Sequence, residues 1–182
     1  MSRINIRPGF YLESLGIEHA DIVFEAIDNN REHLSKWLPF VSFTKSPDDT
    51  EEFILSIVDK KPNEKEEVFT IWYDEEFAGL IGYMNTDRVN RKTEIGYWLL
   101  KSKEGKGIIT QSTTQLIKLA FKRLQMNRIT IRCAVGNNRS SAVPKRLRFT
   151  FEGIERQGEK HDELYFDLEV FSLLKSEWKK QA

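Results

Sequence analysis

The sequence predicts a mixed α/β fold in one domain over residues 1–182. Three observations support this prediction. The length suits one domain, since typical domains hold roughly 100–200 residues. Apolar residues recur at helical spacing early in the chain, and strand-like and helix-like segments alternate late in it. No repeat, linker or low-complexity segment divides the sequence.

The composition is typical of a globular protein. Hydrophobic residues make up 40% of the chain and charged residues 31%, which argues against disorder. No apolar run approaches the roughly 18 residues of a membrane span, and the opening MSRINIRPGF lacks the apolar core of a secretory signal. One cysteine, Cys133, excludes an internal disulfide and a cysteine-based zinc site. We therefore expect a cytoplasmic protein without a membrane partner.

The net charge of zero hides an asymmetry along the chain. Residues 1–90 hold 9 basic and 18 acidic residues, which gives −9, and the remaining 19 basic and 10 acidic residues give +9. A basic half can attract a polyanion and an acidic half a cation. The basic residues are too scattered to predict nucleic-acid binding.

The first third of the chain predicts a strand and a helix. Residues 3–14, RINIRPGFYLES, read as one strand that bends at Pro8–Gly9. Apolar side chains within residues 16–40 recur at roughly helical period, so a helix is expected there. It should stop at Pro39, because proline cannot continue a helix.

A second helix and two strands follow. Residues 46–61 should be helical, with Ser46 or Asp48 as N-cap and acidic residues in the first turn. Residues 67–87 read as two strands around an acidic turn near residues 74–76.

The middle of the chain predicts a strand, a glycine turn and a helix. Residues 92–101, KTEIGYWLLK, are rich in aromatic and β-branched residues, as strands are. The turn in SKEGKG, residues 102–107, comes next. The helix after it carries one apolar stripe, formed by Leu116, Ile117, Ala120, Phe121 and Leu124.

The last third predicts a strand, a short helix and a strand pair. Residues 128–135, RITIRCAV, alternate cleanly, with Ile129, Ile131, Cys133 and Val135 on one face. Residues 137–147 form a short helix opened by Asn and Ser capping chemistry. Residues 148–157 and 162–174 should close the chain as an antiparallel pair.

The Gly105-Lys106-Gly107 turn allows two interpretations. It can be a plain connection, or it can present the free N–H groups and positive dipole end of the next helix to a pyrophosphate. Glycine lets the backbone approach such a ligand without a Cβ in the way. The spacing fits neither a Walker loop nor the G-x-G-x-x-G dinucleotide loop. The tripeptide alone leaves both interpretations open.

Four short sequence segments, which occur in the same order as in one known protein family, give the chain a specific resemblance to it. The loop 102–107 resembles the [Q/R]-x-x-G-x-[G/A] loop of the GCN5-related N-acetyltransferase (GNAT) superfamily, with Ser102 in place of Gln or Arg. NNREHLSKWLPF, EIGYWL and NNRSSAVPKRLRFTFEG resemble further blocks of its RimJ/RimL-type and YdaF-like ribosomal-protein acetyltransferases. Arg148 departs from the glycine of many relatives, which puts the local turn in question.

The resemblance implies a GNAT fold and acetyl transfer from acetyl-CoA to an amine by direct attack on the thioester. The fold would be a twisted, mostly antiparallel sheet flanked by helices, with its central strands splayed. The cosubstrate would be held by the strand end, the turn and a later asparagine. These cofactor-binding residues are Trp98, Leu99, Leu100, Lys103, Gly105, Lys106, Gly107, Ile108, Ile109, Thr110 and Asn137.

Candidate catalytic residues also follow from the resemblance. Ser140 matches the hydroxyl that donates a proton toward the departing sulfur, and Glu159 matches the general base, with Glu94 as second candidate. Taken without the resemblance, Asn137 and Ser140 are ordinary helix caps, and a strand glutamate is usually just solvated. Trp37 and Phe40 can be core residues or can wall the substrate-binding pocket.

Other residues carry less chemistry. Cys133 alternates with Ile and Val on a strand, so we expect it in the core. The three histidines, His19, His33 and His161, are dispersed and lack metal-ligand spacing, so no metal is expected.

Three functions therefore remain. The leading hypothesis is acetylation of a protein N-terminal α-amine, such as that of a ribosomal protein. The runner-up acceptor is a small amine such as a polyamine, amino acid or antibiotic. The third is a non-catalytic acyl-CoA-binding protein. The resemblance also suggests a homodimer.

Overall fold

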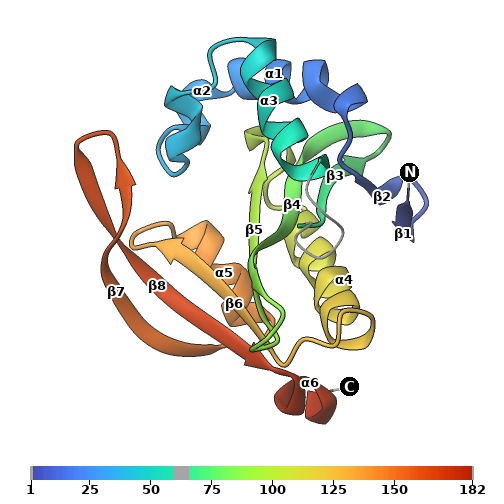
Figure 1. The fold of residues 1–182 in the computed structure, drawn as a ribbon, viewed down its shortest axis with the longest axis vertical. Helices are drawn as coiled ribbons and strands as arrows, with labels where there is room; N and C mark the ends of the chain where they lie inside the picture. The colour runs from blue at the N-terminus through green and yellow to red at the C-terminus, as the bar shows by residue number, and fades with distance from the viewer. Residues whose placement is uncertain (1, 60–65, 182) are drawn as a thin grey trace. The chain divides into compact units, whose positions relative to one another are not determined.

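A computed structural model of the chain describes residues 2–59 and 66–181 (Figure 1). Its strands form a sheet in the order β1-β2-β3-β4-β5-β6-β8-β7. β5 and β6 run parallel, whereas β1–β2, β2–β3, β3–β4, β6–β8 and β7–β8 are antiparallel pairs. The strands are β1 (Arg3–Arg7), β2 (Phe10–Ser14), β3 (Val68–Tyr73), β4 (Glu76–Asp87), β5 (Lys92–Leu99), β6 (Arg128–Ala134), β7 (Thr150–His161) and β8 (Leu164–Leu174).

The described chain forms two compact units. The first contains Met1–Gly82 and Tyr97–Ser112, and the second contains Tyr83–Gly96 and Thr113–Ala182. No helix of the described residues is long and apolar enough to cross a membrane. The helices are η1 (Ile17–His19), α1 (Ala20–Asp28), α2 (Arg31–Leu34), η2 (Pro39–Ser42), α3 (Pro47–Val58), η3 (Lys101–Lys103), α4 (Ile108–Lys122), α5 (Asn138–Arg146) and α6 (Lys175–Gln181).

The N-terminal segment is a hairpin, so the prediction of one bent strand is wrong. β1 and β2 pair antiparallel, because the turn at Pro8–Gly9 reverses the chain instead of bending it. Gly9 has φ +69°, a left-handed conformation that glycine adopts at little cost. Its carbonyl accepts a hydrogen bond from the Asp74 N–H at 2.6 Å, which ties the hairpin to the β3–β4 turn.

The predicted helix of residues 16–40 is broken into short pieces, η1, α1, α2 and η2. α1 ends at Asp28, where the Asn30 side-chain amide donates to the Ala26 carbonyl at 2.9 Å and replaces a helical partner. Asparagine competes in this way with helix continuation. Pro39 begins η2 rather than ending a long helix.

α3 confirms the second predicted helix, and Ser46 is its N-cap. The Asp49 carboxylate accepts from the Ser46 N–H at 2.7 Å and completes a capping box. The N–H groups of Lys45 and Ser46 hold the pKa of Asp49 below its ordinary value. α3 ends at Val58, and the predicted residues 60 and 61 lie outside the described residues.

The core of the first unit is apolar and continuous. It joins α1 and α3, which lie side by side in Figure 1, to strand residues of the same unit. Its members are Leu15, Ala20, Val23, Ala26, Ile27, Leu34, Val41, Ile54, Ile57, Phe77, Leu80 and Trp98.

The second unit packs the apolar stripe of α4 and one face of β6 into its core. The Tyr83 hydroxyl donates to the Leu116 carbonyl at 2.5 Å, so even this buried phenol is partnered. The predicted faces are confirmed for Leu116, Ile117, Ala120, Phe121, Ile129, Ile131 and Cys133, all of them buried. Two predicted members are exceptions. Leu124 lies beyond α4, which ends at Lys122, and is half-buried, whereas Val135 follows β6, which ends at Ala134, and is 47% exposed.

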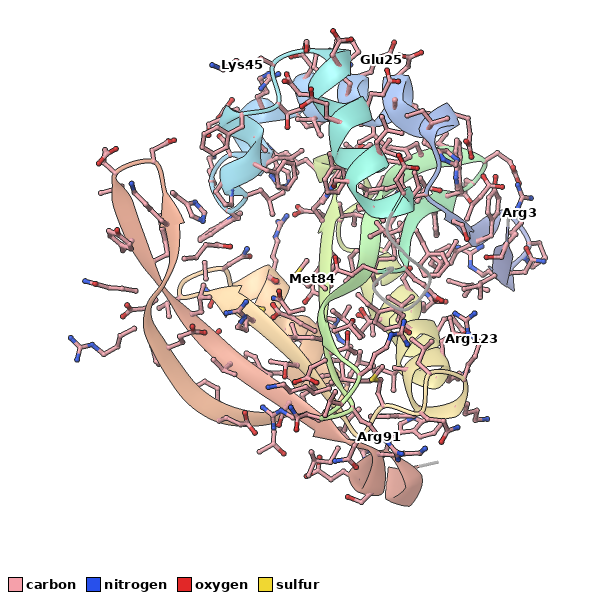
Figure 2. The ribbon with its side chains drawn as sticks, viewed as in Figure 1. Arg3, Glu25, Lys45, Met84, Arg91 and Arg123 are labelled. Carbon is pink, nitrogen blue, oxygen red and sulfur yellow. The ribbon has the colours of Figure 1, made fainter. Side chains whose placement is uncertain are left out.

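β5 pairs with β6 at its start but not at its end. At its start, the carbonyl of Arg91 (labelled in Figure 2) accepts from the N–H groups of Asn127 and Arg128 at 2.7 and 3.2 Å. The parallel ladder then joins residues 92–94 to 128–130 and ends there, although β5 runs on to Leu99 and β6 to Ala134. This early end of the ladder is the splay that the resemblance implies.

The C-terminal elements match the prediction, with one addition. α5 occupies the expected place, and β7 and β8 form the long antiparallel hairpin seen in Figure 1. α6 was not predicted, and it is anchored by Trp178, whose ring lies 5.4 Å from that of Phe121. Arg148 has φ +59°, the left-handed conformation that a glycine there would favour.

Candidate active site

The glycine turn at the start of α4 is an open loop with two left-handed glycines. Gly105 and Gly107 have φ +75° and +73°, so both need the left-handed conformation that glycine tolerates. A Cβ built on Gly105 meets no atom within 4 Å, and one on Gly107 meets only the Gln111 side-chain nitrogen, at 3.5 Å. The loop therefore uses glycine for backbone conformation while its surface stays open. Because the first N–H groups of a helix lack partners in the helix, such a turn suits an anion.

The α4 residues beyond the turn divide into core and surface. The Ile108 and Ile109 side chains are buried, whereas Thr110 is half-buried. Only the backbone of the two isoleucines is therefore available to a ligand. The Gln111 N–H donates to the Gly107 carbonyl at 3.0 Å, which closes the first helical turn.

The two lysines of the loop have protein partners in the same unit. The Lys103 ammonium forms an ion pair with the Glu76 carboxylate, and its side chain is 10% exposed. The hydrogen bond and charge of Lys103 hold the pKa of Glu76 below its ordinary value. The Lys106 ammonium lies 5.7 Å from the centre of the Tyr73 ring. Lys106 is thus the lysine of the pair on the exposed surface.

The strand end before the loop is fixed by close backbone packing. Gly79 has no room for a side chain, since a Cβ there would lie 2.2 Å from the Trp98 carbonyl oxygen. The Leu100 N–H donates to the Ala78 carbonyl at 2.8 Å. The Trp98 side chain is buried 5.9 Å from the Phe77 ring, and Leu99 is the last residue of β5. Trp98 and Leu99 therefore offer a ligand backbone atoms rather than an indole face.

Trp37 and Phe40, the predicted substrate-binding residues, lie on a segment that is held by Arg31. The Arg31 guanidinium donates to the carbonyls of Val41 and Thr44 at 2.9 and 2.6 Å. These bonds fix η2 and the loop around it. Trp37 is half-buried and Phe40 is 36% exposed, so neither is a full core residue.

Asn137 and Ser140 meet at the start of α5 in the second unit. The Asn137 side-chain oxygen accepts from the Ser140 backbone N–H at 3.2 Å, so Asn137 is the N-cap of the helix. The Ser140 hydroxyl donates to the Cys133 sulfur at 3.2 Å. The cap uses the Ser140 backbone and leaves its hydroxyl to other partners. Cys133 is buried, as predicted.

Glu159 pairs with His161, a residue for which the sequence predicts no role. The His161 Nε2 lies 2.7 Å from the Glu159 Oε2, and the imidazole ring centre lies 4.4 Å from that of Phe166. His161 lacks metal-ligand spacing, so the sequence predicts no metal site there. Its two-residue offset from Glu159 on a strand was the signal that could have found the pair, because such residues share a face.

Glu94 belongs to an ion-pair network across three strands. The Arg132 Nε donates to both Glu94 carboxylate oxygens at 3.1 and 3.0 Å, and the Asn85 amide adds a bond of 3.2 Å. The second Arg132 partner is Glu155 at 3.1 Å. Burial alone would lower the pKa of Arg132, but these carboxylates outweigh it and raise that pKa. Glu94 is therefore engaged at both oxygens.

The predicted residues thus lie in several separate local groups. Those from Trp98 to Thr110 form one continuous strand end, turn and helix start, and Asn137 joins Ser140 at another helix start. Glu159 and Glu94 each have partners of their own on the sheet. Within the residues that the structure describes, no group of three or more His, Cys, Asp or Glu could hold a metal ion.

The fold and these groups define the chain as an acetyltransferase of GNAT type. Residues 10–150 match the family model described as "Acetyltransferase (GNAT) domain", and the chain belongs to that family. It is 41% identical over 160 residues to the "Putative ribosomal N-acetyltransferase YdaF" of Bacillus subtilis, which covers 87% of each chain.

Two solved structures are similar over nearly the full length. One is the ribosomal L7/L12 alpha-N-protein acetyltransferase RimL in complex with coenzyme A, at 25% identity and TM-score 0.90, covering 95% of this chain and 98% of that one. The other is the microcin C7 self-immunity acetyltransferase MccE in complex with acetyl-CoA and AMP, at 27% identity and TM-score 0.88, covering 94% and 95%.

Proposed function

We propose that the protein transfers the acetyl group of acetyl-CoA to the α-amine of a protein N-terminus, with a ribosomal protein as the leading acceptor, in the cytoplasm. The glycine turn carries this proposal. Its left-handed Gly105 and Gly107, exposed at the start of α4, suit the diphosphate of a coenzyme. The names of YdaF and RimL support the ribosomal acceptor.

The cosubstrate would be held mainly by backbone. The amides from Gly105 to Thr110 would bind its diphosphate, and the exposed Lys106 would add charge. The backbone of residues 98–100 would pair with the pantetheine arm as an added strand does. A backbone N–H there would stabilise the oxyanion as the amine attacks the thioester carbonyl.

Two side chains would move the protons. Glu159 would accept a proton from the attacking amine, and the C–S bond would break as the amide forms. The Ser140 hydroxyl would then protonate the departing thiolate. An α-amine asks little of the base: with a pKa of about 7.7–8.0, about a tenth of it is neutral at pH 7. A lysine side chain near 10.4 is neutral only about once in 2,500 molecules.

Release of free thiol tests the proposal. Purified protein would be incubated with acetyl-CoA and peptides that carry a free N-terminal α-amine, including ribosomal-protein N-termini. We expect thiol release with acetyl mass added at the N-terminus, and none when the same peptide is N-terminally blocked but keeps its lysines. Silence with every α-amine would overturn the proposal.

A small amine is the second candidate acceptor, because the similar MccE structure is a microcin self-immunity enzyme rather than a ribosomal one. Turnover on polyamines, amino acids or aminonucleotides at a kcat/KM above that on peptides would favour it. Calorimetric binding of acetyl-CoA without turnover on any amine would favour a non-catalytic acyl-CoA-binding protein.

A further inference from the structure

We infer that His161 is a positioning residue that holds the Glu159 carboxylate in place as the proton acceptor, an inference that rests on the proposed function. The side chains come from the same strand, β7, in the second unit, and their contact is direct: the His161 Nε2 lies 2.7 Å from the Glu159 Oε2. His161 has no part in the catalytic assignments above.

The hairpin register places both side chains on one face of β7. Glu159 pairs with Phe166 of β8, and His161 pairs with Leu164. Residues two apart on a strand point to the same side, and a diagonal neighbour across the ladder lies within reach of an aromatic ring. The His161 ring therefore lies against Phe166, with ring centres 4.4 Å apart. This packing fixes the imidazole plane.

The chemistry of the contact sets its direction. A proton acceptor must be ionised, and an ionised carboxylate can only accept hydrogen bonds, so in that role Glu159 takes the hydrogen bond from the imidazole N–H. The His161 side chain is 9% exposed and the Glu159 side chain 39% exposed. A packed ring thus anchors a carboxylate that still faces solvent. Because the bond uses one of its two oxygens, the second keeps its capacity to take a proton.

A β-bulge precedes Glu159 on β7. Between Glu155 and Glu159, four steps along β7 correspond to two steps along β8, from Leu168 to Phe166. The extra residues form a bulge at Gln157, which has φ +52° and whose N–H donates to the Asp167 carboxylate at 2.8 Å. Bulges of this kind re-aim the side chains that follow them.

The contrast with Glu94 shows what the histidine contributes. The Arg132 guanidinium, permanently charged, binds both oxygens of Glu94. An imidazole donates a single hydrogen bond to Glu159 through one ring nitrogen, and unlike a guanidinium it carries no permanent positive charge. Glu159 is thus held at one oxygen by a single donor, whereas Glu94 is bound at both oxygens, and this difference favours Glu159 as the proton acceptor.

Two substitutions separate the hydrogen bond from the packing. His161→Phe keeps a ring against Phe166 and removes the donor, whereas H161Q keeps a nitrogen donor close to the position of Nε2. We expect H161F to lower kcat on an α-amine peptide about 10-fold or more, with the KM for acetyl-CoA changed less than about 2-fold. H161Q should stay within about 3-fold of the wild-type kcat.

A double variant distinguishes positioning from a structural role. If His161 acts through Glu159, H161F should lower kcat less than about 2-fold further in an E159Q background. Independent effects would multiply instead. His161→Leu replaces H161F if the phenylalanine variant melts markedly below the wild type, because leucine also lacks a donor and is smaller.

The possible results distinguish a failure of the His161 role from a failure of the proposed function. Wild-type turnover with a full kcat in H161F, or multiplying effects with E159Q, overturns the role of His161 and leaves the proposed function standing. Failure of H161Q to recover kcat also overturns it. Wild-type silence on every α-amine overturns the proposed function, and the role of His161 falls with it.

Discussion

At the scale of single residues, the backbone and the hydroxyl of Ser140 have different partners. Asn137 caps α5 by accepting the Ser140 backbone N–H, while the Ser140 hydroxyl reaches the Cys133 sulfur. The cap explains why Asn and Ser occur at this helix start whatever the chemistry. The hydroxyl is left over by the cap, so its role can be tested without disturbing the helix.

Substituting the two capping residues should therefore have opposite consequences. Ser140→Ala keeps the backbone donor, so stability should change little, while kcat falls about 10- to 100-fold if the hydroxyl protonates the leaving thiolate. Asn137→Ala removes the capping oxygen and should cost about 1 kcal/mol of stability. Thermal melts and steady-state kinetics on both variants check this. An S140A enzyme with wild-type kcat would contradict the proton-donor role.

Arg148 is a strained residue that glycine should relieve. A left-handed non-glycine residue costs about 1–2 kcal/mol, and Arg148 has φ +59°. Glycine removes that strain, but its greater conformational freedom in the unfolded chain lowers the stability by about 0.4–1 kcal/mol. We expect Arg148→Gly to stabilise the protein by about 0.5 kcal/mol in urea unfolding.

The matched control for that variant is Arg146→Gly. Arg146 is the last residue of α5, where glycine should destabilise by up to about 1 kcal/mol. Equal effects of the two glycines would show that the backbone angle at position 148 carries no strain.

At the scale of elements, the end of β5, the glycine turn and the first turn of α4 form one continuous segment in the first unit. Gly79 lets the backbone at Trp98 approach closely, and Gly105 and Gly107 turn the chain into the helix. Glycine is needed at these positions for two different reasons. Gly79 provides room, whereas the turn glycines provide conformation.

Gly105→Ala should separate ligand contact from strain. The new Cβ meets no protein atom within 4 Å, so only the φ of +75° costs stability, about 1 kcal/mol. If the coenzyme diphosphate lies on this turn, the KM for acetyl-CoA should rise about 10-fold or more. Gly9→Ala is the control, because Gly9 has nearly the same φ, +69°, and belongs to another turn. An unchanged KM in G105A would contradict the diphosphate site.

At the scale of the whole molecule, one contribution to the pH dependence of stability should come from an ion pair across the C-terminal strands. The Arg128 guanidinium pairs with the Glu152 carboxylate, which also accepts from the Ser172 hydroxyl at 2.8 Å. The hydrogen bonds from Arg128 outweigh burial and, with Ser172, lower the pKa of Glu152 from 4.5 to about 2. A depressed carboxyl pKa adds stability above the unfolded value, which is lost as pH falls through the folded value.

Glu152→Gln should therefore unfold more easily at pH 7 but not at pH 2. Because the Glu152 side chain is 37% exposed, solvent screening limits the difference to about 0.5–1 kcal/mol. Chemical unfolding at several pH values should show this difference constant above about pH 5 and shrinking toward pH 2. Glu163→Gln, at a nearly fully exposed side chain, is the control. A difference that persists at pH 2 would exclude the ion pair as its source.

Much of the fold could be predicted from local patterns in the sequence. The Ser46 cap, the α4 stripe and the alternation of β6 are set by neighbours within one turn or one strand. The errors arose where long-range pairing decided. The Pro8–Gly9 turn reverses the chain because β2 pairs with both β1 and β3, which no window over residues 3–14 contains.

For the candidate site, the glycine turn and the α5 start were predicted because they are contiguous segments. Partners brought together by strand pairing were not. Arg132 meets Glu94 from a neighbouring strand, and the His161 ring meets Phe166 across a hairpin. The sequence names each of these residues but not the pairing of each with another.

By itself, then, the sequence determined the class of protein, its elements and the loop on which a coenzyme is proposed to sit, because each of these depends on contiguous residues. Only the tertiary structure decided which carboxylate is bound at both oxygens by arginine and which is held by a single imidazole. Those choices depend on register and bulges across the sheet, where residues distant in the chain become neighbours.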